Sequence, residues 1–556
     1  MPAEQNRKRL AADAVCWILL AVFAFYVNKD IVIKGLYMDD LYMWSCYGEQ
    51  SLLEFAFPIG TSTRFRPVYW LATYLQMAIV GTHISWFVPF NIICNLIAAY
   101  SIYYMVKKIV HAGDLGPVFG FLAGICYLVS RFAYYQIGQA LGLMETMALI
   151  MALWILYLLY RYLNAPHEHT RAELIAKGEK VRAQGGKTEL SPEFLPCGDW
   201  RFAFSLLLYF LLVFTHERYL ALLPLFYLAL LFRCLQEARE YRTAFLKEKL
   251  RFVLAPAVVF VLIFVIRSLC IGSAIPAGTG GTEVTDTFHI SEAISYAISQ
   301  VLYIFGVNAG PEHLCGLTWA DTPARIRLLV KLSVLPLFLI CAVYGGLFLR
   351  RLFAADRSER GACGRELQDI ILFISFIALC IGCSSVTIRV EMRWIYVSYA
   401  AALLFCAWLT GRIIAVLGNS LKGTAVLLLL FALYTGLSVY TNVFYRQYYP
   451  KLYFWPNQLR MNSLAEETWE KYGEEIFGRD IYILENSYEM SDFYKDTFFK
   501  TFDREKKAEG THVYFIDSVS EIPQEDINSG RLIVLEEVPE QNAYRDVTGE
   551  VLSGKR

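Results

Sequence analysis

Eleven long apolar segments, spread over most of the chain, constrain the fold more than any other feature of the sequence. A helix needs about 20 mainly apolar residues to cross the hydrocarbon core of a bilayer, and most of the segments approach that length. They lie at residues 10–28, 84–106, 117–135, 139–160, 202–216, 218–234, 252–271, 328–349, 369–388, 394–413 and 423–441. We therefore expect an all-α polytopic membrane protein with about 11 transmembrane helices.

Composition agrees with this class and excludes others. The chain is 56% hydrophobic and only 18% charged, which is too apolar for a soluble globule of 556 residues. Lys plus Arg and Asp plus Glu both number 51, so the net charge gives no indication of nucleic-acid binding. The scattered cysteines form no disulfide framework, and the close pair Cys380 and Cys383 stands in an apolar run, which favours packing over metal or redox chemistry.

The distribution of basic residues predicts the orientation. The segments 202–216 and 218–234 are either two helices or one broken helix, and this choice reverses everything downstream. We interpret the first apolar segment as a retained helix with the N-terminus inside. If the two segments are separate helices, cytoplasmic segments such as the loop 161–201 hold more Lys and Arg than the outward segments, as the positive-inside rule requires. Three segments then face outward: the loop 29–83, called loop one below, the loop 272–324 and the tail 442–556.

The tail differs in character from the rest of the chain. It is acidic, contains no cysteine, and carries β-type runs at 481–484, 512–516 and 531–535 after a helix-like stretch at 463–477. We expect two domains: a transmembrane domain over 1–441 and a small soluble extracytoplasmic α/β domain over 442–556. Within the outward segment 272–324, the stretch SEAISYAISQVLYIFGVN predicts a partly embedded helix.

The first outward loop carries an acidic pair, Asp39 and Asp40, and an expected interfacial helix opened by Pro67. Two adjacent carboxylates in a cavity can together bind a divalent cation. Alternatively, one serves as a general base while the other supports substrate or metal. The alternative is a helix N-cap or a solvated turn. A cation is thus one option for this pair, and the residues name no other cofactor.

Further ionisable residues gather on the same expected face. Such residues near hydrocarbon mark a substrate path or a paired structural site, although each one alone is more often an interfacial anchor. They are Arg64, Arg66, His216, Glu217, Arg218, Arg389, Glu391 and Arg393.

The order of these elements resembles a known family. A first helix, the outward Tyr37-Met38-Asp39-Asp40, then Arg66-Pro67-Val68 and Asn91 in the second helix are similar to the integral-membrane glycosyltransferases of the GT-C superfamily. The Arg-Pro element resembles the O-mannosyltransferase branch called transmembrane and tetratricopeptide-repeat proteins. The similarity covers the first 110 residues best; YYQIGQALGLMETMAL, FTHERYLALLPL and TIRVEMRWIYVSYAA fit the same layout. No tetratricopeptide repeat is present, and the acidic tail takes its place.

The resemblance implies a polyprenyl-phosphate sugar as donor, a lipid, glycan or protein as acceptor, membrane lipids as surroundings, and a role in the cell envelope. The absence of an N-x-S/T acceptor site and the cysteine-free outer domain favour a bacterial plasma membrane. Asp39 aligns with the family's first acidic residue and is the expected base, and Asp40 would orient the acceptor or bind a cation. Arg is suited to the leaving phosphate because its planar fork binds two oxygens, which favours Arg389 and Arg393, then Arg66. We expect four further residues to position substrate: His216, Glu217, Arg218 and Glu391. For Glu217, an ion pair with Arg218 or with a basic residue of loop one is an equally open alternative.

Two other classes of function remain open from the residues. A transporter or flippase for a lipid-linked or small polar solute suits eleven helices, although the chain has no obvious internal repeat and its charges gather at one face rather than at the midplane. The other is an envelope assembly protein with an inactive membrane part, against which the intact pair Asp39-Asp40 argues.

Overall fold

A computed structural model describes residues 2–33, 35–37, 39–59, 64–80, 83–165, 199–237, 242–276, 288–310, 317–353, 357–387, 390–448, 454–487, 490, 498–499, 501 and 511–555. Within these residues the chain is a multi-pass, mainly helical membrane protein with a small C-terminal sheet. Nine described helices are long and apolar enough to cross a bilayer, or ten if one bent pair counts as a span. The membrane class predicted from the sequence is therefore confirmed.

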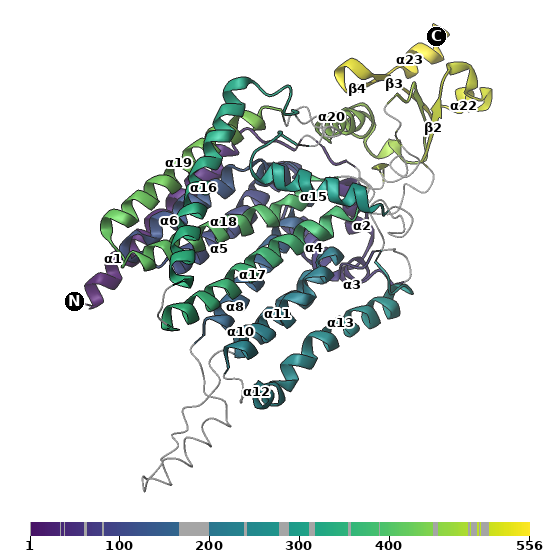
Figure 1. Ribbon diagram of the computed structural model, residues 1–556. Helices are drawn as coiled ribbons and strands as arrows, with labels where there is room; N and C mark the ends of the chain where they lie inside the picture. The colour runs from purple at the N-terminus through teal and green to yellow at the C-terminus, as the bar shows by residue number, and fades with distance from the viewer. Residues whose placement is uncertain are drawn as a thin grey trace.

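The helices form one bundle (Figure 1). In chain order its long members are α1 (Pro2–Val27), α5 (Phe87–Val110), α8 (Leu143–Leu163), α11 (Leu223–Gln236), α13 (Leu250–Ile271), α16 (Ala324–Leu352), α17 (Arg357–Ser385), α18 (Met392–Val416) and α19 (Leu421–Arg446). The bent pair is α6 (Gly116–Val129) with α7 (Arg131–Ile137), and α10 (Asp199–Val213) is a shorter apolar helix. All eleven predicted segments thus coincide with helices, and the last helix extends five residues beyond the predicted end at 441.

The break predicted at Thr215–Tyr219 is present. Helix α10 ends at Val213, and a 3-10 turn, η4 (Glu217–Leu222), then leads into α11, whose second residue is Pro224. Proline suits the first turn of a helix because its missing N–H would have no partner there. The connection places His216, Glu217 and Arg218 between two apolar helices, next to loop one.

Loop one folds into three helices, α2 (Asp39–Glu49), α3 (Leu52–Ala56) and α4 (Pro67–Val80). The last coincides with the helix expected after Arg66, and one of its faces, which includes Tyr69, Thr73 and Met77, is buried. Spacings of four residues place side chains on one helix face, which explains this burial. A helix is present where the stretch beginning at residue 291 predicted one: it is α15 (Ile290–Ile304). The short α12 (Arg242–Glu248) precedes α13.

The C-terminal part is a four-stranded sheet in the order β2-β1-β3-β4. Strand β1 (Asp480–Leu484) is parallel to β2 (His512–Ile516) and to β3 (Leu532–Val538), and β4 (Ala543–Asp546) is antiparallel to β3. The three predicted strands are therefore correct, and β4 was missed because AYRD is short and polar. Two short helices, α22 (Gln524–Asn528) and α23 (Thr548–Leu552), complete the domain.

Helix α20 (Phe454–Ala465) joins the sheet to the bundle, and Figure 1 places it between the two. It starts nine residues before the predicted helix 463–477 and passes into a π-helical turn at Glu466–Glu470 and a 3-10 turn at Gly473–Ile476. Met461 and Leu464 of α20 belong to the same apolar core as the bundle. Ser463 accepts a hydrogen bond from the backbone N–H of Tyr544 at 2.9 Å, which fixes α20 on β4.

Candidate active site

A cavity of about 650 Å³ lies where loop one, the bundle and α20 meet. Its acidic lining residues are Asp39, Asp40, Glu145 and Glu217. Its basic ones are Arg64, Arg66, His216, Arg218 and Arg393. The structure therefore brings together seven of the nine site residues expected from the sequence.

Asp39 and Asp40 open helix α2, and both line the cavity. Asp39 is exposed, whereas Asp40 is buried, and the Asp40 backbone N–H donates to the carbonyl of Tyr37 at 3.2 Å. Successive residues of a helix point about 100° apart, which accounts for the difference in burial. The acidic pair is thus both the start of a helix and part of the cavity wall.

Glu217 holds two guanidinium groups. Its carboxylate forms an ion pair with Arg267 of α13, lies 3.9 Å from Arg66, and accepts a hydrogen bond from the backbone N–H of Phe65 at 3.0 Å. Of the partners considered from the sequence, the loop-one arginine is correct and Arg218 is not. These contacts tie the α10–α11 connection to loop one and to α13.

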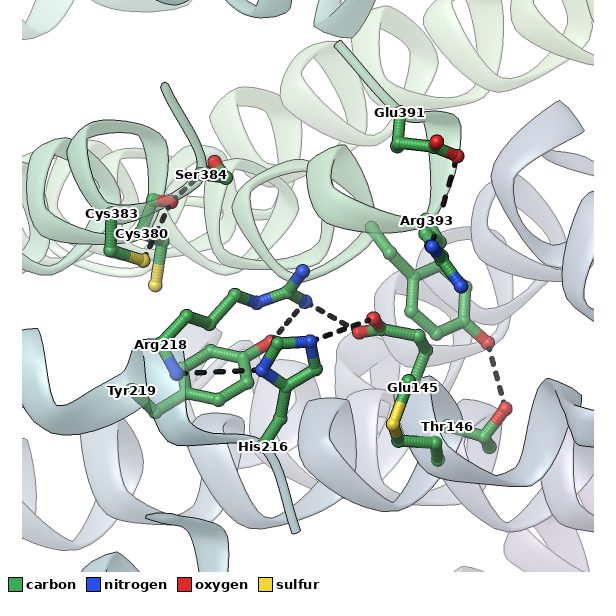
Figure 2. A network of polar contacts seen from close by, with 12 residues as sticks. Glu145, Thr146, His216, Arg218, Tyr219, Cys380, Cys383, Ser384, Glu391 and Arg393 are labelled. Atoms are coloured by element: carbon green, nitrogen blue, oxygen red, sulfur yellow. Dashed lines mark hydrogen bonds and ion pairs between the residues drawn. The ribbon is translucent and has the colours of Figure 1, made fainter. Parts of the chain in front are cut away.

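Arg218 pairs instead with Glu145 of α8, as Figure 2 shows. Its Nη2 donates to Glu145 Oε2 at 2.5 Å and to the hydroxyl of Tyr219 at 2.9 Å. The Nε2 atom of His216 lies 3.9 Å from Glu145 Oε1. Burial lowers the pKa of His216 well below its ordinary value, and the charges of Arg66, Arg218, Arg393 and Arg64 lower it further. The imidazole is therefore neutral at pH 7.

Arg393 lines the cavity from the first turn of α18, and its Nε lies 3.7 Å from Glu391 Oε2 (Figure 2). Glu391 is buried and does not itself line the cavity, so the structure places it behind Arg393. The same guanidinium lies 5.9 Å from the ring centroid of Trp394, at cation–π distance. Arg389 lies outside the described residues.

Several lining residues were missed from the sequence. Glu145 stood in the quoted segment YYQIGQALGLMETMAL, and a lone acid in an apolar helix is a signal for a site. Gln136 of α7 and Gln458 of α20 gave no such signal, because a neutral amide has no characteristic spacing. Arg267, which pairs with Glu217, stands alone in the last turns of α13 and is a lone intramembrane charge of the same kind.

No group of three or more His, Cys, Asp and Glu side chains suited to a metal ion occurs among the described residues. Asp39 and Asp40 therefore lack a described third protein ligand of these types, and we derive no step through a cation. Cys383 lines the cavity and donates to the carbonyl of Cys380 at 3.2 Å, and both thiols are free.

Three residues that line the cavity each carry a buried nitrogen donor that has no hydrogen-bond partner within the described part of the chain. The donors are Arg66 Nε, Arg218 Nη1 and Gln136 Nε2. A buried donor without a partner costs about 1–3 kcal/mol, so the cavity is suited to a ligand rich in acceptor oxygens. A carboxylate able to accept a proton, Asp39, faces the same space.

The chain matches no family model, and no curated protein matches it.

Proposed function

We propose that this protein is a membrane glycosyltransferase that moves a sugar from a polyprenyl-phosphate-linked donor to an acceptor hydroxyl. One observation carries the proposal: the acidic pair of loop one shares a cavity with the guanidinium groups of Arg66, Arg218 and Arg393. A base and a phosphate-binding group are the two things that this displacement requires.

In the proposed reaction Asp39 accepts the proton of the acceptor hydroxyl, and that oxygen attacks the anomeric carbon of the donor sugar. The bond between this carbon and the phosphate oxygen breaks, and the lipid phosphate leaves with the electron pair. A single displacement inverts the anomeric configuration. Asp40 orients the acceptor next to Asp39.

The arginines stabilise the leaving phosphate, whose negative charge increases as the bond breaks. Arg393 and Arg66 are the first choices, because each lines the cavity and each has a carboxylate close by, Glu391 at 3.7 Å and Glu217 at 3.9 Å, that helps to hold its side chain in place. Arg binds two phosphate oxygens at once and stays protonated, so its charge is available at every working pH.

The wall of the cavity also suits a lipid-linked substrate. Ile275 is 76% exposed and Val386 is 39% exposed, and both line the cavity next to its charged groups. Ile275 follows α13 and Val386 follows α17, two helices that are long and apolar enough to span a bilayer. The sugar phosphate of the donor would bind among the charged groups, and its polyprenyl chain would extend out of the cavity along Ile275 and Val386.

The test is transfer from radiolabelled polyprenyl-phosphate sugars in membranes that contain wild type, Asp39→Asn or Glu49→Gln. Glu49 lies at the far end of the same helix α2 and does not line the cavity, so it is the matched control. We expect wild type and Glu49→Gln to transfer label, and Asp39→Asn to lose about 100-fold or more in rate, the size of general-base catalysis. Equal transfer by all three would remove Asp39 as the base. Uptake of solute without any transfer would favour the transporter.

A further inference from the structure

Gln136 is a buried amide on the cavity wall that has no part in the reaction as proposed above. Its side chain is 1% exposed, and its Nε2 has no hydrogen-bond partner among the residues that the structure describes. Buried polar groups in native proteins are almost always paired, so an exception inside a cavity points to a ligand atom as the missing partner.

The backbone around Gln136 is held in one conformation. Helix α7 is bent by 57° from α6, and Ser130 caps its start by accepting from the N–H of Ala133 at 3.2 Å. After α7, the side chain of Asn91 donates to the carbonyl of Gln139 at 2.7 Å, and Gln76 donates to Asn91 Oδ1 at 3.1 Å. Buried amides therefore fix the turn that follows Gln136.

Gly142 is a second constraint on the same segment. A Cβ atom at this position would lie 1.9 Å from the carbonyl oxygen of Gln136, so only glycine allows α8 to begin this close to the end of α7. The backbone of Gln136 is thus held by a rigid scaffold at the cavity wall that this residue lines. A donor fixed in advance loses little entropy on binding, which is the property expected of a recognition residue.

The chemistry of this amide selects its ligand group. Arg66, Arg218 and Arg393 supply charged donors for a phosphate, whereas the Gln136 amide is neutral and best matches a neutral oxygen. The donor sugar is joined directly to the phosphate, so its hydroxyls must lie in this cavity in every turnover. We propose that Gln136 is a specificity-determining residue that donates a hydrogen bond to a hydroxyl of the donor sugar. This inference rests on the proposed function.

The experiment uses the full chain in lipid nanodiscs. The dissociation constant is measured for sugar-free polyprenyl phosphate and for a panel of polyprenyl-phosphate hexoses and pentoses, with wild type, Gln136→Leu and Gln447→Leu. Gln447 is an exposed glutamine at the end of α19 and is the control. For the sugar that wild type binds most tightly, we expect Gln136→Leu to raise the dissociation constant roughly 3- to 10-fold, which corresponds to the loss of one neutral hydrogen bond. Binding of sugar-free polyprenyl phosphate should be unchanged.

A second readout separates recognition from a structural role. Replacing a buried amide that has no partner by an apolar side chain removes a desolvation penalty, so the Tm of ligand-free Gln136→Leu should equal or exceed that of wild type. A lower Tm, equal losses for both ligands, or no loss for either would overturn the inference while leaving the glycosyltransferase proposal standing. Wild type that binds neither ligand and transfers no sugar would instead overturn the proposed function itself.

Discussion

Arg218 Nη2 lies 2.5 Å from Glu145 Oε2, and this contact joins the α10–α11 connection to helix α8 at the floor of the cavity. The side chains are 9% and 1% exposed, so each charge depends on the other for compensation. Arg218 also keeps one guanidinium N–H free of partners within the described chain. The pair therefore holds the arginine in place and still leaves it a donor for a ligand.

Removal of one member of this pair should destabilise the protein strongly. Glu145→Gln leaves a buried guanidinium without a counter-charge, which costs about 3–5 kcal/mol in comparable pairs. We expect a clear fall in Tm for Glu145→Gln and for Arg218→Gln, and a smaller fall for the double variant than the sum of the two. Glu292→Gln, at an exposed position in α15, is the control. Additive losses would show that the two side chains do not act as a pair.

Docking of the C-terminal domain should depend on Gly35. A Cβ at this position would lie 2.5 Å from the carbonyl oxygen of Gln458 and 3.3 Å from the amide nitrogen of Asn462, both in α20. Gln458 lines the cavity, so Gly35→Ala should displace a wall of the site as well as α20. We expect faster limited proteolysis after α19 and reduced sugar transfer.

The matched control for this change is Gly48→Ala. Gly48 also lies in loop one, within α2, but a Cβ there would meet no atom within 4 Å. Alanine favours a helix by about 1 kcal/mol over glycine, so this variant should be at least as stable as wild type. Protection of the C-terminal domain in Gly35→Ala equal to that of wild type would contradict the close approach of α20 to loop one.

Much of the fold could be predicted because a bilayer imposes a length on each helix. That requirement located all eleven apolar segments, and the charge bias separated α10 from α11. Pro67 located the start of α4 in the same local way. The three stronger strands were found as short runs of β-type residues, whereas β4 is held by pairing with β3, which the sequence does not display.

The ion pairs of the site could not be predicted, because they depend on contacts between distant segments. Glu217 and Arg218 are adjacent, yet they point apart and pair with Arg267 and Glu145. Which charges meet is decided by helix packing, which local patterns do not encode. The close approach of Gln458 to the cavity is of the same kind, since α20 begins more than 370 residues after the end of loop one.

The pH dependence of stability should report on His216. Its pKa is lower in the folded protein than the ordinary value of about 6.5, because burial and then nearby arginines oppose its charge. Below pH 6.5 the unfolded chain therefore binds a proton that the folded chain does not, and the folded state loses stability as the pH falls. The slope for one residue is at most about 1.4 kcal/mol per pH unit.

We expect the Tm of wild type to fall between pH 7 and pH 5 more steeply than that of His216→Gln. His83→Gln, which removes an exposed histidine, should retain the wild-type slope. Because the folded state keeps His216 neutral, the imidazole can accept a hydrogen bond near the cavity without adding positive charge. Parallel pH profiles for wild type and His216→Gln would mean that the histidine titrates normally.

Acid should loosen the C-terminal domain at Asp546. Burial raises the pKa of this carboxyl, but hydrogen bonds from Lys471, Thr548 and Tyr472 outweigh it, and the net pKa lies below the ordinary value. The Tyr472 hydroxyl donates to Asp546 Oδ2 at 2.6 Å, and the Thr548 N–H donates to Oδ1 at 2.9 Å. The stability that Asp546 contributes is therefore complete above its unfolded pKa of about 3.9 and is lost as the pH falls through the lower folded value.

Hydrogen exchange of the β4 amides, corrected for the intrinsic pH dependence of exchange, measures this loss in the full chain. We expect protection of β4 in wild type to fall between pH 5 and pH 2. Asp546→Asn should show low protection throughout, with little further change on acidification. Asp517→Asn, at an exposed position after β2, should behave as wild type. Because α20 is fixed to β4 through Ser463, loss of β4 protection should also expose the α20 amides, which links the acid sensitivity of this domain to the cavity that Gln458 lines.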